Sequence, residues 1–453
     1  MLGLDREVAA VTGPPTAERV QALKRILPGA TIRAIPKRTG QTQPCRRLPT
    51  WFMVWFVIGL GLFATDCYRQ VFRWLQRCRR RRTPARTTRC EARRRLGVAP
   101  VRALMDRIVR LLATPRTPGA CYCGLRLMAL DGFVVDLPDT AANGRAFGRP
   151  HNGRAPAAFP PARVPARCAV GTHVLWKCPV KPKHRAEIRL AAALPRFLAP
   201  DRLLLWGRGF CSDDNVRDVA ARRAHVPARA QSTRVRAKVR ALADGSDLAR
   251  LYPSAKHRRK DRDGLLVRAI DYTVGDRGRP GAGAPRRLLT ALLGPRRHPA
   301  RRLIPLYHER WEEELAIDEL KTHQRQRPVL RSQTPAGVVQ ELYGLLLAHF
   351  VVRRRMAAAA AARRRPPRRL SFTGALKIWR CRLPECPRGA RGRRRWYQDL
   401  LAEMAEETVA PRRERVNPRV IRRKLSKWPK KRPEHRHYPP PTQKFGDALE
   451  VLS

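Results

Sequence analysis

The sequence has few acidic residues and no long apolar run, and both absences narrow the class of protein. Asp and Glu number 36 against 96 Lys and Arg, so the 453-residue chain carries a formal net charge of +60. A cytosolic metabolic enzyme does not carry such an imbalance, and we expect a polyanionic partner. No apolar stretch reaches the ~18 residues of a membrane span. The hydrophobic fraction of 43% argues against wholesale disorder. The sequence therefore predicts a soluble globular protein with basic extensions.

The cysteines and the N-terminus also lack a diagnostic pattern. Among 11 cysteines, only Cys121 with Cys123 and Cys381 with Cys386 lie close together, and neither pair has the CxxC…CxxC spacing of a zinc site. After Met1 the chain has no basic segment joined to an apolar one, so no secretion signal is expected. We therefore expect reduced thiols in a cytoplasmic, nucleoid-associated protein.

The N-terminal part predicts a helical domain with a basic segment. Residues 51–64 are apolar, but about 14 residues at ~1.5 Å each fall short of a ~30 Å hydrocarbon core, so we expect a buried helix. Further helices are expected around residues 68–75 and 96–112. Residues 77–95 include four consecutive arginines from Arg79, and we interpret them as a phosphate-contacting arm, with a solvated loop as the alternative.

Beyond residue 120 the pattern is typical of a mixed α/β domain. Three apolar runs predict strands: Gly124–Leu130, Leu203–Trp206 and Leu265–Tyr272. The first ends on Asp131 and would deliver a carboxylate to a sheet edge. The run at 164–170 is expected to be a poor central strand because of Pro161 and Pro165, which lack the N–H that a ladder needs. Helices are predicted for Leu303 to Lys321 and after Thr334, whose side chain would cap a helix with proline at its first position.

Within the first of these helices, four side chains share one face: Tyr307, Arg310, Glu314 and Lys321. Their offsets correspond to roughly 0°, −60°, −20° and −40° at about 100° per residue. Glu312 and Glu313 point away from this face. The stripe could be a ladder of salt bridges on a solvated face. Alternatively, Glu314 and the strand-borne Asp131 hold a divalent metal, and the cations grip an adjacent phosphodiester.

The spacing Tyr-x2-Arg-x3-Glu-x6-Lys resembles the signature of bacterial DDE transposases of the insertion-sequence-four family. Other segments are similar to that family as well: Gly124 to Gly132, Pro138 to Thr140 with Asn143, Leu330 to Ser332, and a tail element from Arg422 to Lys430. The resemblance extends from about Trp51 to Pro440.

The resemblance implies an α/β fold with an RNase-H-like catalytic core and a β-rich insertion, preceded by a small all-α N-terminal domain and followed by a basic C-terminal tail. The corresponding ranges are residues 1–115, 120–380 with the insertion at about 228–290, and 381–453. The resemblance also implies metal-dependent cleavage and transfer of DNA strands, with two Mg²⁺ (or Mn²⁺) ions. The expected partner is double-stranded DNA, both inverted-repeat ends and target, bound by a homodimer without a membrane.

By the same resemblance, Asp131 matches the first aspartate of the catalytic triad and Glu314 matches the glutamate. Both are therefore expected to be catalytic metal ligands. The three remaining members of the signature match residues that grip DNA: Tyr307, Arg310 and Lys321.

The second aspartate is where the sequence departs from the family pattern. The family has Asp-Arg-Gly-Phe after a short strand, and this chain has Gly207 in the place of the aspartate. A glycine offers no side-chain ligand, and Asp213 and Asp214 follow only six and seven residues later, beyond the strand end. We therefore expect a transposase with impaired cleavage. The alternatives are an inactive DNA-binding relic of such an enzyme and a membrane-associated polybasic protein, which the length of segment 51–64 disfavours.

Overall fold

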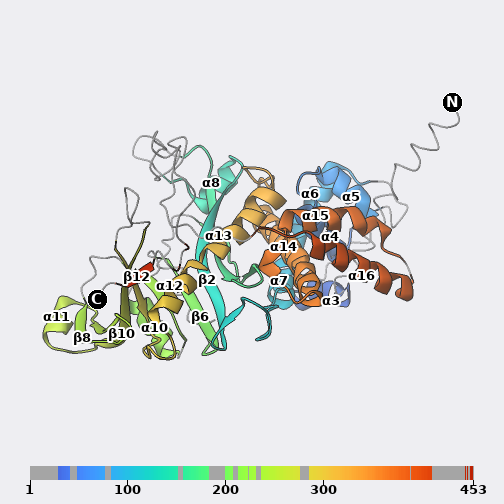
Figure 1. The fold of residues 1–453 in the computed structure, drawn as a ribbon. Coiled ribbons are helices and arrows are strands. Elements are labelled where there is room, and N and C mark those ends of the chain that lie inside the picture. Colours follow the sequence, from blue (N-terminus) through green and yellow to red (C-terminus); the bar gives the residue numbers. More distant parts are fainter. Residues whose placement is uncertain are drawn as a thin grey trace, which may run out of the picture. The chain divides into compact units, whose positions relative to one another are not determined.

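The computed structural model describes residues 29–40, 48–76, 83–150, 157–182, 199–207, 213–222, 224–230, 236–275, 285–387, 389–410, 444, 446 and 449–451 (Figure 1). The chain divides into two compact units. The helix-rich unit comprises Met1–Cys121, Asp131–Ala186 and Glu312–Val409, and the strand-rich unit comprises Tyr122–Leu130, Glu187–Trp311 and Ala410–Ser453. Each unit draws on separate parts of the chain, so the domain ranges 1–115, 120–380 and 381–453 stay predictions.

Helices make up most of the helix-rich unit. The helices before the first strand are α3 (Gly29–Arg38), α4 (Thr50–Leu62), α5 (Tyr68–Gln76), α6 (Arg86–Leu96) and α7 (Ala99–Ile108). The later ones are α8 (Ala141–Phe147), α13 (Trp311–Asp318), the π-helix η4 (Glu319–Gln324), α14 (Pro335–Ala362), α15 (Phe372–Arg382) and α16 (Ala390–Glu406), with short 3₁₀ turns η5 (Pro367–Arg369) and η6 (Leu383–Glu385). Strands β3 (Pro161–Ala169), β4 (Val174–Trp176) and β5 (Lys181–Pro182) complete the unit.

The core of the helix-rich unit is the crossing of α4 with α14 (Figure 1). Residues 52–62 of α4 are all buried, which confirms the buried helix predicted from segment 51–64. Among the described residues, α14 is the one helix long and apolar enough to cross a membrane, and 83% of its most apolar window is buried inside the protein. As predicted, Thr334 caps α14, since its hydroxyl accepts a hydrogen bond of 3.3 Å from the Gly337 N–H.

Part of the predicted basic arm is a packed helix. Residues Arg86–Leu96 form α6, and its Arg93 is buried. The Arg93 guanidinium donates to the side chain of Gln340 at 2.8 Å and to the Gly337 carbonyl at 2.7 Å, both on α14. This arginine therefore holds α6 to the core, and the arm interpretation does not apply to it. The arginine run from Arg79 and the tail element from Arg422 lie outside the described residues.

The strand-rich unit contains most of the sheet. Its strands are β1 (Cys121–Tyr122), β6 (Arg202–Trp206), β7 (Pro227–Ala230), β8 (Ala237–Ala241), β9 (Asp247–Leu251), β10 (Leu265–Val274), β11 (Arg286–Thr290) and β12 (Leu449–Val451). Its helices are α10 (Asp213–Ala221), α11 (Ala255–Arg259) and α12 (Ala300–His308). Strand β2 (Leu125–Asp136) begins in this unit and continues into the helix-rich unit.

The strand order in this unit is β2-β6-β7-β11-β10-β9-β8, and in the helix-rich unit it is β4-β3-β2. The β2–β6 and β6–β7 pairs are parallel, and β7 to β11 are otherwise antiparallel. Residues 127–130 and 203–206 are buried throughout, as expected for parallel strands covered on both faces. The three predicted strands are thus confirmed within a mixed α/β fold that has one large sheet.

Strand β3 contradicts the sequence-based expectation about its prolines. Pro161 is the first residue of β3, where a missing N–H is tolerated. The strand pairs with β5 through Ala162 and Arg163 and with β4 from Arg167 onward. Pro165 falls between these two short ladders, so neither β4 nor β5 needs its N–H, and β3 still lies between β4 and β2 in the sheet. The prediction of a poor central strand here was therefore wrong.

Candidate active site

The parallel pair β2–β6 places the first residues of the site. The register pairs Leu130 with Trp206, the last residue of β6, and Asp131 and Gly207 each follow one member of this pair in the chain. Strand β2 continues to Asp136, so Asp131 lies within the strand and not at its end as the sequence suggested. The ladder between β2 and β6 ends one residue earlier, at Leu130. Asp131 is half-buried and accepts a hydrogen bond of 2.8 Å from the Gly132 N–H.

Gly207 has room for a side chain. A Cβ built on this residue meets no atom within 4 Å, and its φ lies outside the left-handed region that favours glycine. Neither the packing nor the backbone of this position therefore requires glycine. A Cβ could therefore be added here without a steric conflict.

The segment that carries the four signature residues is not one regular helix. Helix α12 ends at His308, α13 begins at Trp311, and η4 is a π-helix from Glu319. The N–H groups of Glu309 and Arg310 donate to carbonyls three residues earlier, which tightens the turn between α12 and α13. The wheel predicted from the sequence assumed about 3.6 residues per turn throughout. That assumption was wrong.

Tyr307 supports the end of strand β6. Its side chain is buried, and its hydroxyl donates a hydrogen bond of 3.0 Å to the carbonyl of Trp206, the residue before Gly207. Burial raises the pKa of Tyr307 to about 12. The sequence placed this residue on DNA, and the structure adds a contact with the strand that carries the degenerate triad position.

The two signature cations are half-buried. The guanidinium of Arg310 lies over the ring of Trp311, 5.4 Å from its centroid. The pKa of Lys321 is lowered, first by burial and then by the nearby Arg325. A partly desolvated cation binds an anion more strongly than a fully hydrated one does.

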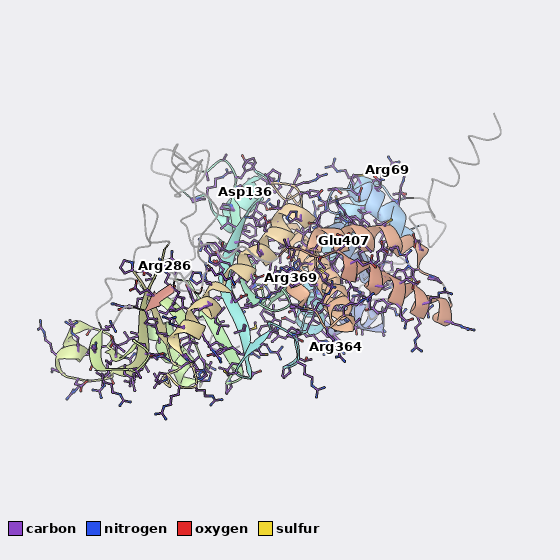
Figure 2. The ribbon with its side chains drawn as sticks, viewed as in Figure 1. Arg69, Asp136, Arg286, Arg364, Arg369 and Glu407 are labelled. Atoms are coloured by element: carbon purple, nitrogen blue, oxygen red, sulfur yellow. The ribbon has the colours of Figure 1, made fainter. Side chains whose placement is uncertain are left out.

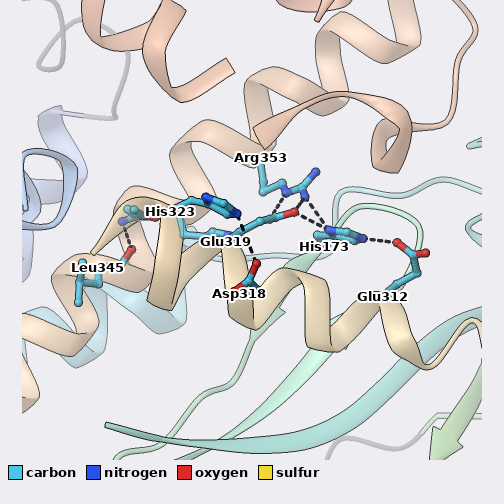
Figure 3. Close-up of polar contacts among 9 residues, drawn as sticks. His173, Glu312, Asp318, Glu319, His323, Leu345 and Arg353 are labelled. Atoms are coloured by element: carbon cyan, nitrogen blue, oxygen red, sulfur yellow. Dashed lines mark hydrogen bonds and ion pairs between the residues drawn. The ribbon is translucent and has the colours of Figure 1, made fainter. Parts of the chain in front are cut away.

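The sequence gave no hint of a buried ionic network around the segment that carries Glu314 (Figure 3). Glu312 lies 2.7 Å from Nε2 of His173, and Glu319 lies 2.9 Å from Nδ1 of the same ring. Arg353 Nε donates to Glu319 at 2.8 Å, and His349 Nε2 lies 3.1 Å from the same carboxylate. We name these five residues the His173 network. Local sequence pattern could not reveal this network, because the partners of His173 lie over 100 positions away in the chain and those of His349 lie on another helix.

The donors described here do not complete a two-metal site. Asp131 and Glu314 offer the hard oxygen ligands that Mg²⁺ prefers. Gly207 offers none, and the described residues contain no group of three or more His, Cys, Asp or Glu that could hold a metal ion. Residues Asp213 and Asp214 open helix α10, and residues 208–212 lie outside the part of the chain that the structure describes.

The chain is similar in sequence to known transposases. The profile of the transposase DDE domain matches residues 123–351, and that of the insertion element 4 transposase N-terminal region matches residues 17–106. The chain is 31% identical over 392 residues to transposase InsG of insertion sequence element IS4 from Escherichia coli K12, covering 85% of this chain and 87% of that one. Among solved structures, a piggyBac transposase synaptic complex with hairpin DNA matches with a TM-score of 0.39 at 11% identity, covering 85% and 84% of the two chains. A match this weak supports no detail.

The class defined by the domain and the sheet is the DDE transposases, enzymes that depend on divalent metal. The chain belongs to the insertion sequence IS4 family of these transposases.

Proposed function

We propose that the chain is a transposase that binds the inverted-repeat ends of its insertion sequence as a homodimer and cleaves DNA strands poorly, because Gly207 replaces the second triad aspartate. The observation that carries the proposal is the register of β2 with β6, which pairs Leu130 with Trp206. Asp131 follows Leu130 in the chain, and Gly207 follows Trp206. In the family pattern both of these positions carry an aspartate, and here only Asp131 supplies a carboxylate.

In this proposal each remaining signature residue has a role. Asp131 and Glu314 would hold Mg²⁺ or Mn²⁺, two ions in an intact triad, and the metal would supply Lewis-acid activation of the phosphodiester. Arg310 and Lys321 would neutralise phosphate charge. Tyr307 would contact the DNA backbone near the cut. The core is proposed to be RNase-H-like, with a β-rich insertion at about 228–290, an all-α N-terminal domain and a basic tail that also binds end DNA. Because the substrate is DNA, the protein is proposed to be cytoplasmic and associated with the nucleoid.

A second candidate is a catalytically inactive DNA-binding relic. It is favoured by the same observation, because the loss of one carboxylate weakens metal binding and misplaces the attacking water. The two candidates differ only in whether any strand cleavage remains.

The test is to restore the carboxylate. We expect Gly207→Asp to raise the rate of strand cleavage at inverted-repeat ends in Mg²⁺ by ~10² or more, which corresponds to ~2.7 kcal/mol of transition-state stabilisation. The matched control is Gly207→Asn, which has the same shape but is a poorer ligand for a hard cation. Binding of Mn²⁺, followed by calorimetry, should tighten with the aspartate and not with the asparagine.

Further variants identify the other ligands. The gain should vanish when Asp131→Ala or Glu314→Ala is added, since the three carboxylates act as one unit. Brisk cleavage by the unaltered chain that is insensitive to Gly207→Asp, but abolished by Asp213→Ala or Asp214→Ala, would show that a neighbouring aspartate has taken over. Detectable but slow cleavage by the unaltered chain would support the impaired enzyme. Cleavage no faster than background would support the inactive relic.

A further inference from the structure

The His173 network joins three parts of the helix-rich unit. His173 lies in the turn between β3 and β4, Glu312 and Glu319 lie on α13 and η4, and Arg353 lies on α14 (Figure 3). His349 also lies on α14. All five residues are buried, and none exposes more than 8% of its surface. Because these elements are distant in sequence, the ionic contacts fix the segment 311–324 against both a strand turn and the core helix.

Such a network costs desolvation free energy. Burial by itself would raise the pKa of Glu319, but Arg353 and then His173 outweigh it and hold that pKa well below its usual range. Buried ion pairs contribute little net stability compared with apolar residues of similar volume, and their best-attested benefit is a unique geometry. The network therefore points to a requirement for accurate placement of the segment.

The backbone of the turn also indicates constraint. His173 has a φ of 54°, in the left-handed region that β-carbon-bearing residues adopt rarely. Its N–H donates to the Ala169 carbonyl at 2.8 Å, which closes the turn after β3. The ring is thereby held between the carboxylates of Glu312 and Glu319, and neither side chain can move without breaking a contact.

The placement of α13 matters because Glu314 lies between Glu312 and Glu319 in the chain. Glu314 follows Glu312 by two residues and precedes Glu319 by five, and Lys321 follows Glu319 by two. Glu314 is half-buried, whereas Glu312 and the adjacent Glu313 are buried. The contacts of His173 therefore lie on both sides of the proposed metal ligand along the helix.

We propose that His173 is a positioning residue of the transposase, which fixes α13 through Glu312 and Glu319 so that Glu314 is presented to the reacting phosphodiester. This inference rests on the role of Glu314 in the proposed function. His173 acts only through the helix and does not touch DNA or metal itself.

The first test uses the Gly207→Asp chain as background. Adding His173→Ala should lower the rate of cleavage of bound end DNA by about tenfold or more, as supporting residues of metal ligands do. It should also raise the Mg²⁺ concentration for half-maximal cleavage, while the affinity for end DNA stays within about twofold. His173→Gln, whose amide can reach one of the two carboxylates, should recover part of the rate.

The matched control is Gln340→Leu, on the same helix α14 as Arg353. Gln340 is buried and makes hydrogen bonds with Arg93 and the Gly97 carbonyl, so its loss also removes buried polar contacts. It lies in the second turn of α14, before His349 and Arg353, and its described hydrogen bonds go to Arg93 and Gly97. Gln340→Leu should lower the melting temperature without raising the Mg²⁺ requirement.

A second measurement does not depend on cleavage. In the chain without the Gly207 change, hydrogen exchange of the peptide that covers residues 311–324 should become about tenfold faster in His173→Ala and not in Gln340→Leu. Unchanged exchange in this peptide would overturn the positioning role. Equal losses of rate in both variants, in proportion to melting temperature, would overturn it as well. If Gly207→Asp fails to cleave while exchange responds as expected, the proposed function fails and the placement of α13 by His173 stands.

Discussion

Tyr307 is predicted to contact DNA and also makes a hydrogen bond within the fold. Sequence similarity assigns it to DNA, yet its hydroxyl donates to the Trp206 carbonyl at 3.0 Å within the strand-rich unit. A hydrogen bond to a strand-end carbonyl holds that end in place, and the next residue is Gly207. The residue can therefore affect cleavage through the strand, through DNA, or through both.

The Tyr307→Phe variant separates these roles. Loss of the hydroxyl leaves the buried carbonyl of Trp206 without this donor, and the free energy of unfolding should fall by about 1 kcal/mol. This change is measured by urea denaturation, while the affinity for end DNA is measured by fluorescence anisotropy. A large loss of DNA affinity with unchanged stability would instead assign the hydroxyl to DNA, as the sequence suggested.

Among the elements, the crossing of α4 and α14 depends on two glycines. A Cβ on Gly61 would lie 2.1 Å from the Gly344 carbonyl oxygen, and one on Gly344 would lie 2.4 Å from the Val57 carbonyl oxygen. These distances are impossible for real atoms, so the two helix backbones approach as closely as they do only because side chains are absent at both positions.

The effect of Gly61→Ala follows from a comparison of magnitudes. Alanine is favoured over glycine inside a helix by about 1 kcal/mol. Separating two packed helices costs about 1–3 kcal/mol, and here the clash involves backbone atoms that cannot rotate away. We expect a net loss of about 2 kcal/mol in the free energy of unfolding. Gly294→Ala, whose Cβ meets no atom within 4 Å, is the control and should leave stability nearly unchanged. Equal stability of the two variants would contradict the described crossing.

For the whole molecule, the dominant property is its charge. Exposed arginines occur on both units: Arg69 and Arg364, labelled in Figure 2, lie in the helix-rich unit, and Arg240 lies in the strand-rich unit. Some cations are unavailable, since Arg93 and Arg353 are buried in polar contacts. The net charge of +60 is nevertheless unchanged by ion pairs, because each pair contains one cation and one anion.

Binding to DNA should therefore depend steeply on salt. If ~8 phosphates are neutralised, log K should fall against log[KCl] with a slope of about −7, because each contact releases condensed counterions. Anisotropy titrations of a labelled duplex between ~50 and ~200 mM KCl would measure the slope. A slope shallower than about −2 would mean that the basic surface does not engage the DNA backbone.

Several features could be predicted from the sequence because they depend on local pattern. Apolar runs identified the strand around Leu203 and the buried helix from Thr50, and Thr334 identified the start of α14. The family and its expected residues came from the spacing of Tyr307 with Glu314, and Gly207 was visible as a departure from the family pattern. Each of these signals lies within a few residues of its neighbours in the chain, where steric and hydrogen-bonding rules act directly.

Other features depended on contacts between distant residues. Pro165 can lie in β3 because the ladders with β4 and β5 do not need its N–H. Arg93 is buried because α14 supplies acceptors for its guanidinium. The division of the predicted helix into α12, α13 and a π-helix followed from packing that periodicity alone does not report. The partners of His173 lie 139 and 146 positions away. Sequence by itself determined the family and the local elements, whereas only the tertiary structure decided which charges are buried and what holds Glu314, because burial and ionic pairing are properties of the folded chain.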